Sequence, residues 1–586
     1  MAMNLLLPLN RQTEPDMRPK KLTLLCVFLI SLQSFGQAKL RKLPATINHP
    51  AINVYSPYIS LDGNTLVFIS DNSDENQLTM FYTAKKDAVN WKEPVMLPKT
   101  VNNRLNFLGG FALSADGKTL YISSLKSGGL GGFDILMSPL KGTVWAEPTN
   151  LGLPINSREH DACPSLTPDE TTLYFMRCTK MDQRSASDCR ILVSKKSRLG
   201  RWEEPVELPE YINTGNSQTP RIMGDGETLL FSSDQFTNGK GGMDLYVTKL
   251  NGSTWSRPIP VDFANTSKDD QYVSATSLGR YLLKDQPGQR SNEIVEMLFT
   301  DDIKPKAAVK MEGNVSGISN PGSPYIAVFD QQSQKSIYNG RPDNSGSFTF
   351  YLKEGARYDL SVEPETDAYT FYSKVFDFTG DHVPMFEQVD ATLKPVVNGT
   401  ELELRIDFET YSSKIAGYSA QELRRLARMV KGNANHKFLI DVSLAGYLSD
   451  SIKSSPDLTQ LHIDTLHFTV EKQIPDTVKL DSLLLVMNKR DSLKKMETDS
   501  TIVSDDGYFK DQIDSIRLTA FKTIQIDSIG VKYTYHNDRT ELQAKAIADY
   551  LINEGASASN LKLTHSARPE AVAEKRKTLV KIKVVE

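Results

Sequence analysis

The amino-acid sequence predicts a multidomain, mainly β protein: a five-bladed β-propeller, then a small β-sandwich, then an α/β domain with an insertion. Three observations predict this fold class. A turn-and-strand motif recurs in the first half of the chain, short alternating strands follow it, and helical periodicity begins after residue 400. At 586 residues the chain is too long for a single core, so several domains are expected.

The repeated motif is a turn that leads into a strand. Asp-Gly pairs favour tight turns because glycine accepts positive φ, and the alternating apolar residues that follow predict a half-buried strand. Equivalent turn positions are separated by 54, 53, 56 and 53 residues. They are Asp62 in "ISLDGNTLVFIS", Asp116 in "LSADGKTLYISS", Asp169 in "LTPDETTLYFMR", Asp225 in "IMGDGETLLFSS" and Leu278 in the shorter "SLGRYLL".

Two other features keep the same spacing. Each of the four tryptophans is followed three residues later by proline, at Trp91, Trp145, Trp202 and Trp255. An asparagine follows an apolar residue once per repeat, at Asn48, Asn102, Asn156, Asn213 and Asn265. A period in this range indicates a propeller, in which radial stacking buries both faces of each sheet. We expect five blades within 39–302, and we expect residues 39–48 to supply the outer strand that the fifth copy lacks.

The motif "LSADGKTLYIS" resembles the WD40-like (PD40) repeat of exported bacterial propellers, whose core reads Ser-Pro-Asp-Gly-Lys-x-Leu-x-Phe. The resemblance covers all five copies and implies the propeller fold. It implies little about the ligand, because propellers host many functions.

Residues 1–38 resemble a secretory signal peptide with extra N-terminal residues. After Met17, basic residues precede an apolar run from Leu22 to Leu32, and small and polar residues follow. A single membrane anchor is the alternative, although the run is short for a bilayer. We therefore expect an exported protein, with Met17 as a candidate start.

Three cysteines follow the expected signal peptide, at positions 163, 178 and 189. In an oxidising compartment Cys178 and Cys189, at the facing ends of two predicted strands, can form a disulfide that staples a hairpin. Three buried thiols are the alternative. Both remain open from the sequence.

Residues 303–395 alternate polar and apolar positions at short intervals, which predicts a small β-sandwich. The segment resembles the carboxypeptidase regulatory-like domain. The family's Asp-x-x-Gly-x-Phe signature stands here as Asp343, Gly346 and Phe348, and its Tyr-x-Leu strand as Tyr358 to Leu360. That resemblance implies a stabilising or interaction module without catalytic residues.

Helical periodicity marks the C-terminal region. Residues 419–432 predict a helix in which Ser419 and Glu422 form a capping box, and residues 537–555 predict a second helix. Strands are expected on either side of each helix. The basic residues of the first helix, Arg424, Arg425, Arg428 and Lys431, are interpreted as its solvated face rather than as an anion site.

The order strand, helix, strand, then helix and strands resembles the OmpA-like domain that binds peptidoglycan, split here into 396–449 and 533–586. The family grips diaminopimelate with an Asp after its second strand and an Arg on its second helix, a charge pairing that needs the two groups face to face. Here Ser449 takes the Asp position with Asp450 one step away, and Gln543 takes the Arg position with Arg539 one turn earlier. The resemblance implies the scaffold, with an altered pocket.

Residues 450–532 form a polar insertion between the two halves, rich in Asp, Ser, Lys and Thr. Leu480, Leu483, Leu484 and Met487 fit one helical face, and the remainder is expected to be partly disordered. A solvated excursion and a partner-docking element are both open.

No catalytic motif was found, so we expect a protein that is not an enzyme, with no cofactor and no metal site. The net charge of −4 gives no general attraction to nucleic acid. The domain order resembles exported proteins of the Bacteroidota and is similar to the type IX secretion peptidoglycan-associated lipoproteins without their helical repeats. It implies a periplasmic scaffold associated with the outer membrane or cell wall, without a transmembrane helix.

The expected partners are envelope or secretion-system proteins, and peptidoglycan if the altered pocket still binds. A glycan- or peptide-binding propeller without peptidoglycan contact is the main alternative, and a hydrolase is the third.

Overall fold

The computed structural model describes residues 40–72, 78–102, 110–125, 128–182, 185–235, 239–410, 412–445, 460–496, 506–536, 539–568 and 577–585. The expected signal peptide lies outside these residues. The chain divides into two compact units. The first comprises 1–314, 345–358 and 376–390, and the second comprises 315–344, 359–375 and 391–586.

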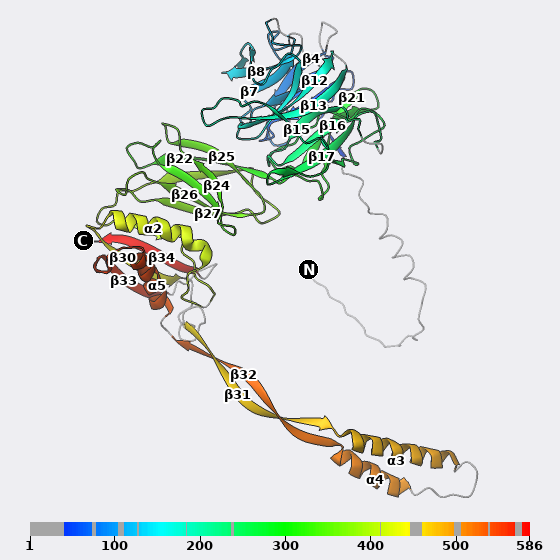
Figure 1. Ribbon diagram of the computed structural model, residues 1–586, viewed down its shortest axis with the longest axis vertical. Coiled ribbons are helices and arrows are strands. Elements are labelled where there is room, and N and C mark those ends of the chain that lie inside the picture. The colour runs from blue at the N-terminus through cyan, green and yellow to red at the C-terminus, as the bar shows by residue number, and fades with distance from the viewer. Residues whose placement is uncertain are drawn as a thin grey trace, which may run out of the picture. The chain divides into compact units, whose positions relative to one another are not determined.

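Five antiparallel sheets of the described chain repeat within the first unit and form the blades of the predicted propeller (Figure 1). The first blade contains β2 (Val54–Ile59), β3 (Thr65–Ser70), β4 (Thr79–Ala84) and β5 (Val95–Met96). The second contains β6 (Phe111–Leu113), β7 (Thr119–Ser124), β8 (Asp134–Lys141), β9 (Val144–Trp145) and β10 (Thr149–Asn150). The third contains β11 (His160–Leu166), β12 (Thr172–Met181), β13 (Ala186–Lys195) and β14 (Val206–Glu207). The fourth contains β15 (Ser217–Ile222), β16 (Thr228–Ser233), β17 (Asp244–Asn251), β18 (Thr254–Trp255) and β19 (Ile259–Pro260). The fifth contains β20 (Tyr281–Pro287), β21 (Asn292–Leu298) and β1 (Leu40–Lys42).

The ring closes through the N-terminal strand. β1 pairs with β21 antiparallel, with Arg41 opposite Glu296, and so completes the fifth blade. This is the outer strand that the sequence predicts from residues 39–48. The first and last parts of the propeller are thereby joined by backbone hydrogen bonds, which remove one exposed sheet edge.

The recurring asparagines hold neighbouring segments together. Asn213 accepts a hydrogen bond from the Ile191 amide at 2.7 Å and donates to the Ile191 and Leu208 carbonyls, both at 3.0 Å. A primary amide can satisfy both backbone groups of one residue, so it takes the place of a strand neighbour. Asn48, Asn102, Asn156 and Asn265 make the same double contact, with Ile294, Met80, Ile135 and Leu245.

A disulfide joins Cys178 and Cys189, which are directly paired on β12 and β13. Of the two arrangements that the sequence leaves open, this is the hairpin staple. Cys163 on β11 is a buried thiol that is not part of the disulfide. Burial raises the pKa of this thiol to about 12, so it stays protonated and unreactive at neutral pH.

Two further sheets follow the propeller. One contains β25 (Ser347–Lys353), β22 (Ala308–Ser316) and β28 (Phe386–Thr392), in that order. The other contains β24 (Ser336–Gly340), β23 (Tyr325–Asp330), β26 (Arg357–Glu363) and β27 (Tyr372–Asp377). These strands occupy the segment for which the sequence predicts a β-sandwich.

The C-terminal α/β region has the sheet order β29 (Glu401–Leu404), β34 (Lys577–Val585), β30 (Lys437–Ala445) and β33 (Leu561–Arg568). Only the β30–β33 pair of this sheet is parallel. Helices α2 (Ala420–Gly432) and α5 (Arg539–Asn553) share one apolar core with the sheet, which includes Leu426, Ile440, Ile547 and Ile582.

The insertion contains regular structure that the sequence interpretation missed. β31 (Gln460–Pro475) and β32 (Phe521–His536) pair over their whole length as a two-stranded ribbon (Figure 1). The helices α3 (Thr477–Met496) and α4 (Asp506–Thr519) lie between these two strands in the chain. The expectation of partial disorder is therefore wrong for these segments. Leu480, Leu483, Leu484 and Met487, for which the sequence predicts a helix, all lie on α3, and Leu484 is 56% exposed.

The described residues contain no helix that is both long and apolar enough to span a membrane.

The asparagine contacts make a direct prediction. We expect Asn213→Ala to lower the free energy of unfolding of the propeller by about 2–6 kcal/mol, because the Ile191 amide and the Leu208 carbonyl lose their partner at about 1–3 kcal/mol each. Asn251→Ala, at an exposed position of β17, should change it by less than about 0.5 kcal/mol. Urea unfolding followed by tryptophan fluorescence measures both, and equal effects of the two substitutions would contradict the assignment.

Candidate functional site

The innermost segment of each blade contains one residue with a left-handed backbone. These residues are Ser56, Gly110, Cys163, Thr219 and Tyr272, with φ values of 50°, 57°, 51°, 47° and 47°. Each lies six residues before the turn position of its repeat. In β2, β11 and β15 the register of pairing shifts at this point, as it does at a β-bulge. For Thr219 and Tyr272 the conformation is unusual and strained, and such strain is concentrated at functional sites.

The sequence carries a signal for these bulges that the sequence analysis did not use. Pro57, Pro164 and Pro220 follow the left-handed residue inside β2, β11 and β15. A proline within a strand indicates an edge or a bulge, because it cannot donate a ladder hydrogen bond. Gly110 is the one glycine among the five positions, so residue type alone does not reveal the ring.

Arg221 of β15 occupies the centre of the propeller. Its Nε donates to the Val273 carbonyl at 2.9 Å, and its Nη1 donates to the Phe111 and Pro164 carbonyls at 3.2 and 3.5 Å. Each of these carbonyls belongs to the residue directly after a left-handed position. One side chain of the fourth blade therefore binds the second, third and fifth blades.

The first blade completes the arrangement around the Arg221 guanidinium. The guanidinium carbon lies 4.5 Å from the centre of the Tyr58 ring, a cation–π contact. Arg221 is only 6% exposed, and burial lowers the pKa of its guanidinium. The cavity around Arg221 measures about 20 Å³, which is room for about one water molecule. Arg221 therefore fills the space between the blades at this level.

A second, larger cavity, which we call the mouth cavity, is lined by residues of the first and fifth repeats. It encloses about 210 Å³ between the first and fifth blades. Its lining combines hydroxyl, amide and carboxylate groups with aromatic and aliphatic side chains. The lining residues are Tyr55, Ser56, Ile69, Leu78, Asp269, Gln271, Tyr272 and Asp285.

The polar groups of the mouth cavity are held in fixed positions. Asp285 accepts hydrogen bonds from the Ser56 amide at 3.2 Å and from the Asn292 amide nitrogen at 2.9 Å. Burial raises the pKa of the Asp285 carboxyl. The Tyr272 hydroxyl is shielded from solvent and has no hydrogen-bond partner among the described residues, and burial also raises its pKa well above the usual range. A concave site with a few fixed polar groups is typical of ligand pockets.

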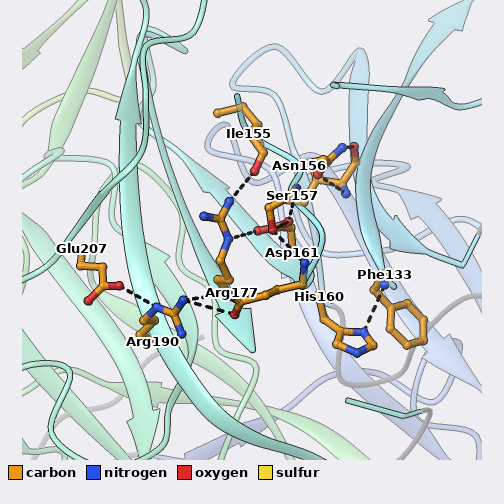
Figure 2. A network of polar contacts seen from close by, with 11 residues as sticks. Phe133, Ile155, Asn156, Ser157, His160, Asp161, Arg177, Arg190 and Glu207 are labelled. Carbon is orange, nitrogen blue, oxygen red and sulfur yellow. Dashed lines mark hydrogen bonds and ion pairs between the residues drawn. The ribbon is translucent and has the colours of Figure 1, made fainter. Parts of the chain in front are cut away.

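A buried ion pair stabilises the third blade just before its left-handed residue (Figure 2). Asp161 accepts from Arg177 Nε at 2.6 Å and from the Ser157 amide at 2.6 Å. Arg177 Nη2 also donates to the Ile155 carbonyl at 2.9 Å. Burial raises the pKa of the Asp161 carboxyl, and Arg177 opposes that shift.

The fifth blade repeats this arrangement with other residues. Asp270 pairs with Lys284, whose Nζ also donates to the Ala264 carbonyl at 2.7 Å. The Thr266 amide donates to Asp270, as the Ser157 amide does to Asp161. Asp161 lies two residues before Cys163, and Asp270 lies two residues before Tyr272. The two ion pairs therefore hold the segments that contain the left-handed residues.

The pocket residues predicted from the OmpA-like resemblance are only partly described. Ser449 and Asp450 lie outside the described residues. Arg539 and Gln543 lie one turn apart on α5, and they are 4% and 2% exposed. Gln543 Nε2 donates to the Ser412 carbonyl at 3.0 Å, whereas its Oε1 is buried without a partner among the described residues.

Two expectations for α2 are wrong. Ser419 makes no side-chain capping bond; its hydroxyl accepts from the Asp407 amide instead. Glu422 accepts from the Arg405 amide, so the capping box is absent. Both side chains instead accept hydrogen bonds from backbone amides of the segment that precedes the helix.

Arg425, assigned above to the solvated face of the helix, is instead buried. Its guanidinium pairs with Asp359 at 2.9 Å, Glu422 at 3.1 Å and Glu363 at 3.3 Å. Both Asp359 and Glu363 belong to β26, so this cluster attaches α2 to the sandwich sheet of the second unit. Burial raises the pKa of the Glu422 carboxyl despite Arg425.

Comparison with known proteins gives structural neighbours only. No family model matches the chain, and no curated protein matches it. TolB from Acinetobacter baumannii is 12% identical, with 42% of this chain and 54% of that chain covered and a TM-score of 0.28. An endo-arabinase from Bacteroides thetaiotaomicron is 16% identical, with 45% of this chain and 99% of that chain covered and a TM-score of 0.31. At such identities the likeness concerns the fold alone.

The central arginine gives the second prediction. We expect Arg221→Met to lower the free energy of unfolding of the propeller by about 3–5 kcal/mol, because three carbonyls lose their shared donor. Arg221→Lys should recover only part of this, since an ammonium group lacks the planar fork of donors. Arg201→Met, at an exposed position, is the matched control. Denaturant unfolding measures all three, and a stability of Arg221→Met equal to that of the control would refute the role.

The buried thiol gives the third prediction. In a chain that begins at residue 39, iodoacetamide at about pH 8 should leave native Cys163 unmodified and alkylate it in urea, because a raised pKa and burial suppress the thiolate. Mass spectrometry of the tryptic peptide measures the modified fraction. Rapid alkylation of the native protein would show that the thiol is accessible.

Proposed function

We propose that this protein is a non-enzymatic scaffold of the bacterial cell envelope. In this proposal the propeller holds a protein or glycan partner, and the C-terminal α/β region tethers the protein to peptidoglycan or the outer membrane. One observation carries the first part: the mouth cavity is concave and lined with polar groups that hydrogen bonds hold in place, such as Asp285 and Asp269. A concave site with a few fixed polar groups suits the retention of a ligand.

The tether is supported by the polar groups that remain on α5. Arg539 is a buried cation, and Gln543 has an unpartnered oxygen one turn away. A buried polar atom without a partner is costly, so a ligand that supplies a donor there would gain binding energy. Because family ligands carry both an amine and a carboxylate, the Gln543 oxygen suits the amine and Arg539 suits the carboxylate.

The location is part of the same proposal. The signal-like N-terminus and the resemblance to exported Bacteroidota proteins favour the periplasm, with envelope or type IX secretion proteins as partners. The Cys178–Cys189 disulfide agrees with an oxidising compartment.

A hydrolase is the second candidate. It is favoured by one observation: two carboxylates, of Asp269 and Asp285, line the same cavity. Paired carboxylates carry out glycoside hydrolysis by acid–base or nucleophilic steps. A glycan- or peptide-binding propeller without cell-wall contact remains the alternative if the altered C-terminal pocket does not bind.

The fourth prediction concerns the tether. The chain from residue 39 onward should co-sediment with purified peptidoglycan sacculi, and Arg539→Ala combined with Gln543→Ala should reduce the bound fraction at least about tenfold, since the ligand charge pairing is lost. Lys545→Ala, on the exposed side of α5, is the control and should bind as the parent does.

Circular dichroism of the double variant must match that of the parent for the comparison to hold. Parent protein that stays in the supernatant would refute the peptidoglycan tether. Release of reducing sugar or peptide from sacculi or oligosaccharides, abolished by Asp285→Asn, would replace the scaffold with the hydrolase.

A further inference from the structure

We propose that the insertion is a dimerisation element, in which α3 packs antiparallel against α3 of a second copy of this chain. The proposal goes beyond the proposed function, because neither the partner of the propeller nor the tether gives this segment a role. It is carried by the exposed apolar side chains of the insertion and by the charges on either side of Leu485.

The insertion buries few of its apolar side chains. Among those that the structure describes there, the buried ones are Phe509, Ile513 and Ala520. A two-stranded ribbon or a lone helix is only marginally stable in water without a packed face. Exposed apolar surface of this extent marks an interaction site. The large apolar side chains that are exposed in the insertion are Leu466, Phe468, Val470, Val478, Leu484, Leu485, Tyr508, Leu518, Phe521, Ile529 and Val531.

The helix α3 has apolar residues on two opposite sides. It lies beside α4 (Figure 1), and its residues Leu483 and Met487 are half-buried. Val478 and Leu485 are seven residues apart, so they share the opposite side of the helix, where they are 72% and 70% exposed. A helix that is apolar all round is normally covered all round. The side with Val478 and Leu485 is therefore left for a partner.

The charges on this exposed side are arranged symmetrically about Leu485. Asp481 lies four residues before Leu485, and Lys489 lies four residues after it. Neither has an oppositely charged residue three or four positions away on α3, and the ion pairs described in the insertion involve other side chains. When two copies of α3 pack antiparallel about a two-fold axis at Leu485, Asp481 of each copy faces Lys489 of the partner subunit.

A second copy fits this surface better than other occupants do. In an isologous contact the same residues serve both partners, so one apolar residue between opposite charges is complementary to itself. The charges also select the antiparallel direction, because a parallel pair in register would place like charges together. A helix on a lipid surface keeps its charges on the opposite face, whereas Asp481 lies between Val478 and Leu485.

The length of α3 sets the strength of the contact. The helix has 20 residues and is therefore about 30 Å long. A contact along one helix of this length is at the small end of specific interfaces, which are weak and reversible. We therefore expect a dimer that forms in the micromolar range rather than a permanent assembly.

The test uses the chain from residue 39 onward in sedimentation-velocity experiments between about 1 and 100 µM. The parent should shift from monomer to dimer as its concentration rises. Leu485→Glu should weaken the dimer at least about tenfold, because it brings two carboxylates to the two-fold axis. Leu199→Glu, at an 83% exposed position outside the insertion, is the matched control and should dimerise as the parent does.

Charge reversal tests the pairing of Asp481 with Lys489. Asp481→Lys alone should weaken the dimer several-fold, because each contact then joins two cations. Asp481→Lys combined with Lys489→Asp should restore the dimer, since the reversed pairs are again opposite in charge. A double variant that dimerises as poorly as the single variant would overturn the inference.

Cross-linking tests the direction of the helices. Leu485→Cys should give a covalent dimer on mild oxidation, because the two copies meet at this residue. Ser492→Cys is the control on the same side of α3. Its two copies would lie about 21 Å apart along the helix axis, too far for a disulfide. Non-reducing gel electrophoresis measures both variants.

The remaining outcomes are equally decisive. A parent that stays monomeric over the whole concentration range, a Leu485→Glu variant that dimerises as the parent does, or the absence of a cross-link through Leu485→Cys would each overturn the inference. The proposed scaffold is not affected by these results, because its tether is measured separately by co-sedimentation with sacculi.

Discussion

The contact of Arg221 with three backbone carbonyls is the interaction on which the centre of the propeller depends. Each left-handed residue bends its strand, and the next carbonyl, at Phe111, Pro164 and Val273, then needs a donor that the ladder does not supply. A guanidinium group suits this task because it offers five donors in one plane. The left-handed residues therefore create backbone carbonyls without a ladder partner, and the Arg221 guanidinium supplies the donors for those carbonyls.

The repeats share their main-chain geometry but differ in the side chains that satisfy it. The asparagine that clamps the preceding sheet is kept in every blade, because its partners are main-chain groups common to all of them. The carbonyl just before that asparagine is satisfied differently: by Arg177 in the third blade, by Ser217 Oγ in the fourth and by Lys284 in the fifth. Main-chain geometry thus repeats while charge does not, and the fifth blade alone brings two carboxylates to the mouth cavity.

The sequence was sufficient to predict features that depend on local pattern. Spacing predicted the blades, and the missing outer strand of the fifth copy predicted the closure by residues 39–48, since a blade needs an outer strand whichever part of the chain provides it. The bulges were missed because their residue types vary, although the prolines inside β2, β11 and β15 mark them. The solvated position of Arg425 and the capping role of Ser419 were wrong because both side chains contact segments distant in sequence. The ribbon was missed because its strands lie on either side of two helices and a polar stretch.

The two carboxylates of the mouth cavity bear on catalysis and recognition in different ways. A general acid or nucleophile must change its bonding during the reaction. Asp285 and Asp269 already hold backbone amides of Ser56 and Met243, so both are fixed parts of the fold. Groups fixed in this way lose little entropy when a ligand binds, which favours recognition. The left-handed backbone at Tyr272 costs stability, and its hydroxyl is shielded from solvent and unpartnered among the described residues.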